Sequence, residues 1–89
     1  MKLFFITDAY ESKVNYFVRD CKTTTALETL KLIEIEYRGA RDLLDNIIFN
    51  MPLGKEYDEL SDLLAKKERE FYSAKDEAFA RLTKITATA

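Results

Sequence analysis

Apolar residues recur along most of this chain at alternating spacings of four and three positions. The first series is Ala26, Leu30, Ile33, Tyr37, Ala40, Leu44, Ile47 and Met51, and the second is Tyr57, Leu60, Leu64, Phe71, Ala74, Ala78 and Ile85. Such spacing places every member of a series on one face of an α-helix. The only proline, Pro52, separates the two series, and Lys67 and Arg81 hold the two positions where the second series lacks an apolar residue. The pattern predicts two long helices, one of which carries cations in its apolar seam.

The length and composition favour one all-α domain over residues 1–89. A chain of 89 residues with two glycines and one proline is short and contains few helix breakers. We expect an N-terminal arm over residues 1–7, a short helix over 8–22 and two long helices over 25–50 and 56–84. The arm would pack on a neighbouring subunit, because the rest of the chain offers no strand with which it could pair.

Local signals set the expected helix boundaries. Asp8 with Glu11, and Thr25 with Glu28, have the spacing of a helix-capping residue and its partner. Pro52 disfavours helical backbone at the residue before it, so the second helix should stop there. The turn that follows is short, and this makes the two long helices antiparallel neighbours.

Charge and cysteine content narrow the class of protein. Fourteen basic and sixteen acidic side chains give a net charge of -2, which is too small to steer the protein along polymeric nucleic acid. Cys21 is the sole cysteine, so we expect no internal disulfide, a reducing compartment and a small buried side chain. The apolar run at residues 3–6 is too short for a signal sequence, and no later segment approaches a membrane span. We therefore expect a cytoplasmic protein without a membrane partner.

The sequence lacks the side chains that most catalytic sites use. It contains no histidine, one cysteine and no glycine-rich phosphate loop. Neighbouring acids such as Asp58 and Glu59 point to different sides of a helix, so they do not converge on one metal ion. The serines have no adjacent base to activate them. We expect no catalytic residue, no metal site and no cofactor, and we interpret the chain as a binding or structural protein, not an enzyme.

Several residues are candidates for binding an anionic ligand, each with a structural alternative. An unpaired charge in a helix seam is costly, so Lys67 and Arg81 reach the bundle rim, pair with a facing helix or bind an anion. Tyr10, like the other tyrosines at helical positions, is a core residue or a platform for stacking a base. The corner from Lys22 to Thr25 combines a lysine, hydroxyls and helix amides, which cap the helix or bind phosphate.

One part of the chain resembles a known family. The residues that carry the resemblance are Tyr37, Arg41, Pro52, Lys55, Glu56, Leu64, Lys67, Glu70, Ala78, Phe79, Ala80 and Arg81. In this order they resemble the small phage proteins that block CBASS, a bacterial antiphage immune system, by sequestering cyclic oligonucleotides. The similarity covers residues 37 to 81, and Lys55 stands where that family usually has arginine.

The resemblance implies a fold, an assembly and a ligand. The fold would be a short first helix kinked against two long antiparallel helices. The assembly would be a hexamer whose intersubunit pockets hold cyclic di- and trinucleotides, such as cGAMP, without cleaving them. Tyr10 would stack on a base, and Lys22 with Thr24 would bind phosphate. The remaining ligand-binding residues would be Lys55, Lys67 and Arg81.

The competing interpretation is a small protein-interaction module, such as a phage or bacterial inhibitor or adaptor, with no nucleotide ligand. We expect a homo-oligomer in either case, because the second helix carries Leu27, Leu43 and Ile48 beside its main seam. One neighbouring helix cannot cover all of this apolar surface. Gly39 lies inside the same helix, where glycine is unfavourable, and it predicts close packing of backbone there.

Overall fold

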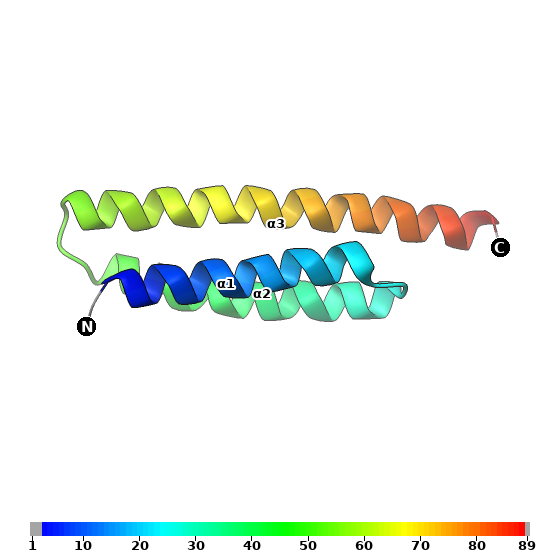
Figure 1. The fold of residues 1–89 in the computed structure, drawn as a ribbon, viewed down its shortest axis with the longest axis horizontal. Helices are drawn as coiled ribbons and strands as arrows, with labels where there is room; N and C mark the ends of the chain where they lie inside the picture. The colour runs from blue at the N-terminus through cyan, green and yellow to red at the C-terminus, as the bar shows by residue number, and fades with distance from the viewer. Residues whose placement is uncertain (1–2, 89) are drawn as a thin grey trace.

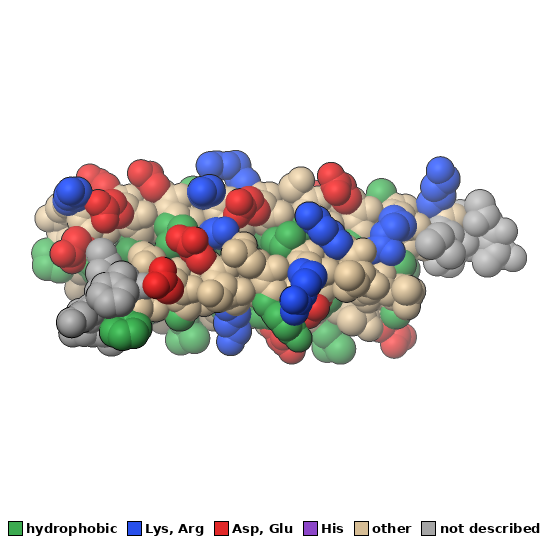
Figure 2. Space-filling model, in the orientation of Figure 1, with side chains coloured by type: hydrophobic (Ala, Val, Ile, Leu, Met, Phe, Trp, Pro, Cys, Tyr) green, Lys and Arg blue, Asp and Glu red, His purple; other side chains and the backbone are tan. Residues whose placement is uncertain are grey.

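Three α-helices make up the computed structural model, which describes the backbone of residues 3–88 and the side chains of residues 5–84. Helix α1 spans Leu3–Thr23, α2 spans Leu27–Phe49 and α3 spans Lys55–Thr88. No strand occurs within residues 3–88, so the predicted all-α class is confirmed. Helix α3 runs along the antiparallel pair of α1 and α2, and the molecule is a rod of 53 × 17 × 16 Å (Figure 1). Acidic and basic side chains are mixed over the face shown in Figure 2, in keeping with the net charge of -2.

Helix α1 is longer than the sequence predicted. The expected arm over residues 1–7 is wrong from Leu3 onward, because these residues are helical; residues 1 and 2 lie outside the described part of the chain. Ile6 lies one turn before the buried Tyr10 and packs against the core. Burial of this side chain favours a helix that starts earlier. Asp8 is consequently an interior residue of α1 and does not cap it.

Helix α2 begins two residues later than predicted, and without the predicted cap. Its N-cap residue is Ala26, which has extended backbone and leaves the helix without a side-chain cap. Thr25 with Glu28 therefore does not form the expected capping box. The backbone N–H of Ala26 instead donates to Oγ1 of Thr24 at 3.4 Å. This hydrogen bond stabilises a turn at residues 24–26 in place of helical backbone, so α2 starts after that turn.

The connection between α2 and α3 lies where the proline indicated. Helix α2 ends at Phe49, and the side-chain amide of Asn50 donates to a backbone carbonyl one turn earlier at 2.8 Å. Pro52 lies outside both helices, as expected from its missing N–H. Helix α3 begins at Lys55, one residue before the predicted start, and its backbone continues to Thr88.

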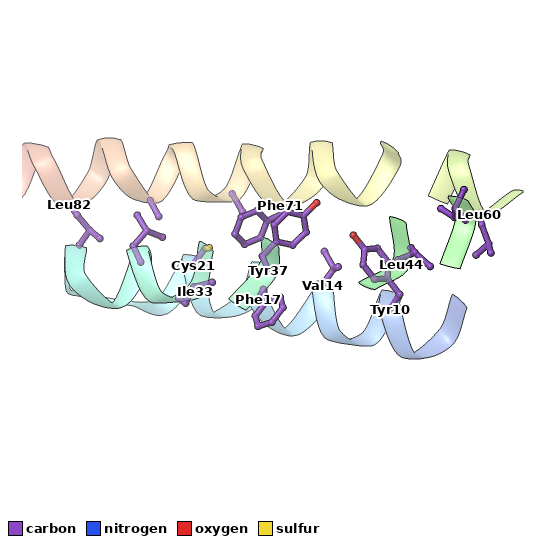
Figure 3. Close-up of a cluster of buried hydrophobic side chains, with 14 residues drawn as sticks. Tyr10, Val14, Phe17, Cys21, Ile33, Tyr37, Leu44, Leu60, Phe71 and Leu82 are labelled. Atoms are coloured by element: carbon purple, nitrogen blue, oxygen red, sulfur yellow. The ribbon is translucent and has the colours of Figure 1, made fainter. Parts of the chain in front are cut away.

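One continuous apolar core lies between the three helices (Figure 3). Its buried members are Tyr10, Val14, Phe17, Cys21, Leu30, Ile33, Tyr37, Leu44, Ile48, Leu60, Phe71, Ala74, Ala78 and Leu82. Most come from the two predicted series, but α2 buries Ile48, whereas the predicted Ile47 is 37% exposed. The side chain of Ile85 lies outside the described residues, and Leu82 is the last buried member on α3.

Candidate functional site

The six predicted ligand-binding residues lie in separate parts of the molecule. Lys22, Thr24 and Arg81 lie around the end of the bundle where α1 turns into α2. Tyr10 and Lys67 lie inside the bundle, and each is only 6% exposed. One chain therefore gathers three of the six residues and buries two others away from solvent.

Lys55 is the sixth predicted residue and lies at the opposite end of the rod, where α3 begins (Figure 1). It is separated from Arg81 by about 39 Å along the helix, at 1.5 Å per residue. Its ammonium lies 4.0 Å from a carboxylate oxygen of Glu59, one turn further on. An exposed ion pair of this kind contributes little. Within one chain, Lys55 cannot reach a ligand held at Lys22.

Arg81 binds the C-terminal end of helix α1. Its guanidinium donates a hydrogen bond of 3.0 Å to the backbone carbonyl of Cys21. The last carbonyls of a helix have no partner within it and carry the negative end of its dipole. The half-buried Arg81 therefore has a structural role within the chain, and this accounts for a cation in the seam.

Lys67 is buried between α1 and α3 with partners on both helices. Its ammonium donates to Oδ1 of Asn15 at 3.0 Å and pairs with a carboxylate oxygen of Glu70 at 3.0 Å. The contact with Asn15 joins residues that are 52 positions apart. A buried ammonium needs such partners to offset its lost hydration. Lys67 is therefore satisfied without an anionic ligand.

Tyr10 lies in the core of the bundle, which is the first of the two alternatives that the sequence left open. Its ring points from α1 toward α2 and α3, close to Tyr37 (Figure 3). The hydroxyl oxygens of both tyrosines are buried and lie near each other, but neither makes a hydrogen bond of good geometry with a described residue. Burial raises the pKa of both phenols above the ordinary value. A ring in this position is not accessible for stacking on a base.

Lys22 and Thr24 remain accessible, although their surroundings are not strongly cationic. Lys22 lines a polar groove of about 330 Å³ between α1 and α3, together with Glu70 and Glu77. Carboxylates beside a lysine weaken its attraction for phosphate. Thr24 Oγ1 contacts the backbone of Ala26, so its hydroxyl is engaged in the turn.

A candidate binding surface of a different kind, made of exposed apolar side chains, lies on the side of α2 that faces away from the core. The sequence indicated only part of it. We call it the α2 face and define it by Leu32, Ile35, Gly39, Leu43 and Ile47. Leu32 and Ile35 are 61% and 63% exposed, and Leu43 and Ile47 are 69% and 37% exposed. Of the residues predicted beside the main seam, only Leu43 belongs to this face, because Ile48 is buried and Leu27 packs against the core.

A shallow apolar groove adjoins the α2 face. It has a volume of about 400 Å³ and runs between α1 and α2. Its lining residues are Phe5, Ile6, Ala9, Tyr10, Lys13, Ala40, Leu43, Leu44 and Ile47. In Figure 2, several hydrophobic side chains appear along the lower edge of the molecule, on the side away from α3, with acidic and basic side chains between them. The groove and the α2 face share Leu43 and Ile47.

Gly39 does not have the close packing that the sequence predicted. A Cβ atom at this position would meet no heavy atom within 4 Å. Packing within the chain therefore gives no reason for glycine at the centre of the α2 face.

Two further features of the described residues limit the chemistry. No group of three or more histidine, cysteine, aspartate or glutamate side chains there is arranged to hold a metal ion. None of the helices in that part of the chain combines the length and apolar character that crossing a bilayer requires.

No family model, curated protein or solved structure matches this chain. The α2 face and the Lys22 corner are therefore the two candidate sites.

Proposed function

We propose that this protein is a helical interaction module that acts by stoichiometric contact through the α2 face. The observation that carries the proposal is the set of four large apolar side chains, 37% to 69% exposed, on one side of one helix. Contiguous apolar surface of this kind is typical of binding sites in soluble proteins. Removal of apolar surface from water contributes about 25 cal/mol per Å².

The total exposed area is larger than that of a compact monomer of the same mass. The chain exposes 6264 Å² at a mass of 10.4 kDa. A compact monomer of that mass exposes about 5400 Å². The excess reflects the elongated rod of 53 × 17 × 16 Å, in which each helix has a side that no other helix covers.

The proposal is tested by the reactivity of a thiol placed on the α2 face. Leu43→Cys is made in a chain whose own thiol is removed by Cys21→Ala, and its rate of maleimide labelling is measured. Glu59→Cys in the same background is the matched control on exposed α3. We expect slower labelling of position 43, and not of position 59, at high protein concentration or in native cell extract. Equal and fast labelling of both positions under all conditions would contradict the proposed function.

A second candidate function is sequestration of cyclic oligonucleotides without cleavage, in a cytoplasmic, hexameric assembly of the kind that the family resemblance implies. One observation supports it: Lys22, Thr24 and Arg81 come from three different segments and lie around one end of the bundle. A pocket completed by another subunit could add contacts there. Tyr10 is left out of this proposal, because its ring is buried.

This second candidate is tested by thermal unfolding with cGAMP or a cyclic trinucleotide. Ligand at 1,000 times its Kd adds about 4 kcal/mol to stability, and each kcal/mol raises Tm by about 4–8 °C in a domain this small. Lys22→Ala should reduce the shift, while Lys66→Ala, which removes an exposed lysine from α3, should not. The ligand recovered after heating should be intact. Absence of any shift with the wild-type chain would rule out this candidate.

A further inference from the structure

We propose that the α2 face binds a second copy of the same chain, with the two α2 helices antiparallel and crossing at Gly39. This inference rests on the interaction function proposed above and specifies its partner. Three properties of the face support it: its symmetry about Gly39, the charges along its border and the open space at the glycine.

The apolar residues are arranged almost symmetrically about Gly39. Ile35 lies four positions before it and Leu43 four positions after it. Leu32 and Ile47 lie seven positions before and eight positions after it. A two-fold axis at Gly39 therefore places Ile35 against Leu43 of the second copy, and Leu32 against Ile47. A dimer interface with two-fold symmetry requires this kind of self-complementary surface.

The charges on one border of the face are complementary when two copies cross antiparallel at Gly39. Lys31 and Arg38 precede Gly39, whereas Asp42 and Asp45 follow it. With 3.6 residues per turn, all four lie about 60° to 120° to the same side of Gly39 around the helix axis. The two-fold axis places Arg38 beside Asp42 of the second copy and Lys31 beside Asp45, each within about 3 Å along the axis.

These charged side chains are available to a partner. All four are exposed. Arg38 bonds Glu34 through a single nitrogen at 3.0 Å, and its guanidinium has further donors. Asp42 accepts from Arg41 through one carboxylate oxygen at 3.4 Å, which leaves its other oxygen as an acceptor. Among the described residues, no ion pair involves Lys31 or Asp45.

The other border of the face has the same complementarity. Glu36 lies three positions before Gly39, while Lys13 of α1 lines the groove beside Ala40 and Leu43. The two-fold axis brings Glu36 level with Lys13 of the second copy. Opposite charges therefore meet on both sides of the apolar strip.

Gly39 is explained by close approach of a second backbone. Glycine inside a helix is unfavourable relative to alanine, and the chain itself leaves open space where a Cβ would lie. At the crossing point of two helices, a missing Cβ lets the backbones approach. Gly39→Ala should therefore raise the Tm of the monomer and weaken the dimer at least threefold in Kd.

The charge pairing is tested by sedimentation equilibrium over a range of protein concentrations, with circular dichroism as the check on folding. Arg38→Asp and Asp42→Arg should each raise the dimer Kd at least tenfold. The double variant with both substitutions should return to near the wild-type Kd, because its charges are complementary again. An equimolar mixture of the two single variants should form heterodimers. Failure of both the double variant and the mixture to associate would overturn the charge pairing.

The orientation is tested by cross-linking in the Cys21→Ala background. An oxidised mixture of Ile35→Cys and Leu43→Cys chains should form a mixed disulfide, whereas Ile35→Cys alone should form far less. The reverse result would overturn the antiparallel arrangement. A wild-type chain that stays monomeric at every concentration would overturn the second copy as partner. The proposed function would still stand if native cell extract slowed maleimide labelling of the thiol at position 43. It would fail only if that labelling were also unaffected by the extract.

Discussion

The aromatic rings of Tyr37 and Phe71 stack face to face across the interface of α2 and α3, with centroids 4.0 Å apart and planes inclined by 9°. Both side chains are fully buried. Tyr72 contacts both rings edge-on, with centroid distances of 5.7 and 5.3 Å. Aromatic pairs in such geometries contribute beyond the area they bury, so this cluster is central to the packing of α3.

Phe71→Ala should therefore be among the most destabilising single substitutions in the chain. Loss of a buried phenylalanine costs about 3–5 kcal/mol, because a cavity remains. Phe71→Leu retains most of the volume and should cost less. Chemical denaturation of both variants measures the difference. Similar, small losses for both would show that the cluster contributes little.

Replacement of both buried phenols by phenylalanine should leave stability unchanged or increase it. The hydroxyls of Tyr10 and Tyr37 are buried and lie near each other, without a hydrogen bond of good geometry to a described residue. A buried polar group without a partner costs about 1–3 kcal/mol. Tyr16→Phe is the control, because Tyr16 is exposed. A loss above about 1 kcal/mol in the double variant would indicate that the two hydroxyls are bonded, to each other or to a buried water molecule.

Stability should fall as the pH rises above about 9. Burial raises the pKa of the Cys21 thiol above 9.0 and that of Tyr10 and Tyr37 above 10.0. The unfolded chain therefore releases these protons at a lower pH than the folded chain. Their contribution is complete below the unfolded pKa values and is lost as the pH rises from those values through the higher pKa values of the folded chain.

Denaturation at a series of pH values between neutral and strongly alkaline measures this loss. Each group that keeps its proton in the folded chain but has lost it in the unfolded chain changes the slope of the unfolding free energy against pH by about 1.4 kcal/mol per pH unit. The variant with phenylalanine at both buried tyrosine positions should have a shallower slope above pH 10. The same slope in both chains would contradict the assignment to Tyr10 and Tyr37.

The buried ammonium of Lys67 should stabilise the fold less than an apolar side chain of similar length would. Lys67→Met removes the desolvation cost together with the charge, so its stability should equal or exceed that of the wild type. Asn15→Leu should cost about 1–3 kcal/mol, because it leaves the ammonium with one partner fewer. Combining the two substitutions should restore stability if the coupling is direct. An additive loss in the double variant would contradict this.

The sequence predicted the class and the two long helices because their apolar spacing is regular over many turns. Leu30, Tyr37 and Phe71 are buried as expected. The prediction was wrong at Ile47, because the side chain buried in the core there is that of Ile48. A strict seven-residue repeat rotates by about 20° per repeat around a straight helix, so the buried face moves forward by one residue after several repeats.

The early start of α1 and the surroundings of the predicted ligand residues could not be derived from local patterns. Ile6 favours helix through a contact with the core, and no local propensity reports such contacts. The positions of Lys67 and Arg81 in the seam were correct, but their partners, Asn15 and the carbonyl of Cys21, lie far away in sequence. Periodicity identifies a face of a helix and does not identify what packs on it.

The two polar contacts of α3 with α1 also constrain the order in which a new chain can fold during synthesis. They join positions separated by 52 and 60 residues, so Asn15 and Cys21 of α1 are synthesised well before their partners Lys67 and Arg81. Until then, the apolar side of α1 and α2 that faces α3 has nothing to cover it. Such exposure makes a nascent chain prone to aggregation or to capture by a chaperone. The bundle closes only when the last third of the chain has been translated, and a message truncated before α3 would yield a helical pair with its core open to solvent.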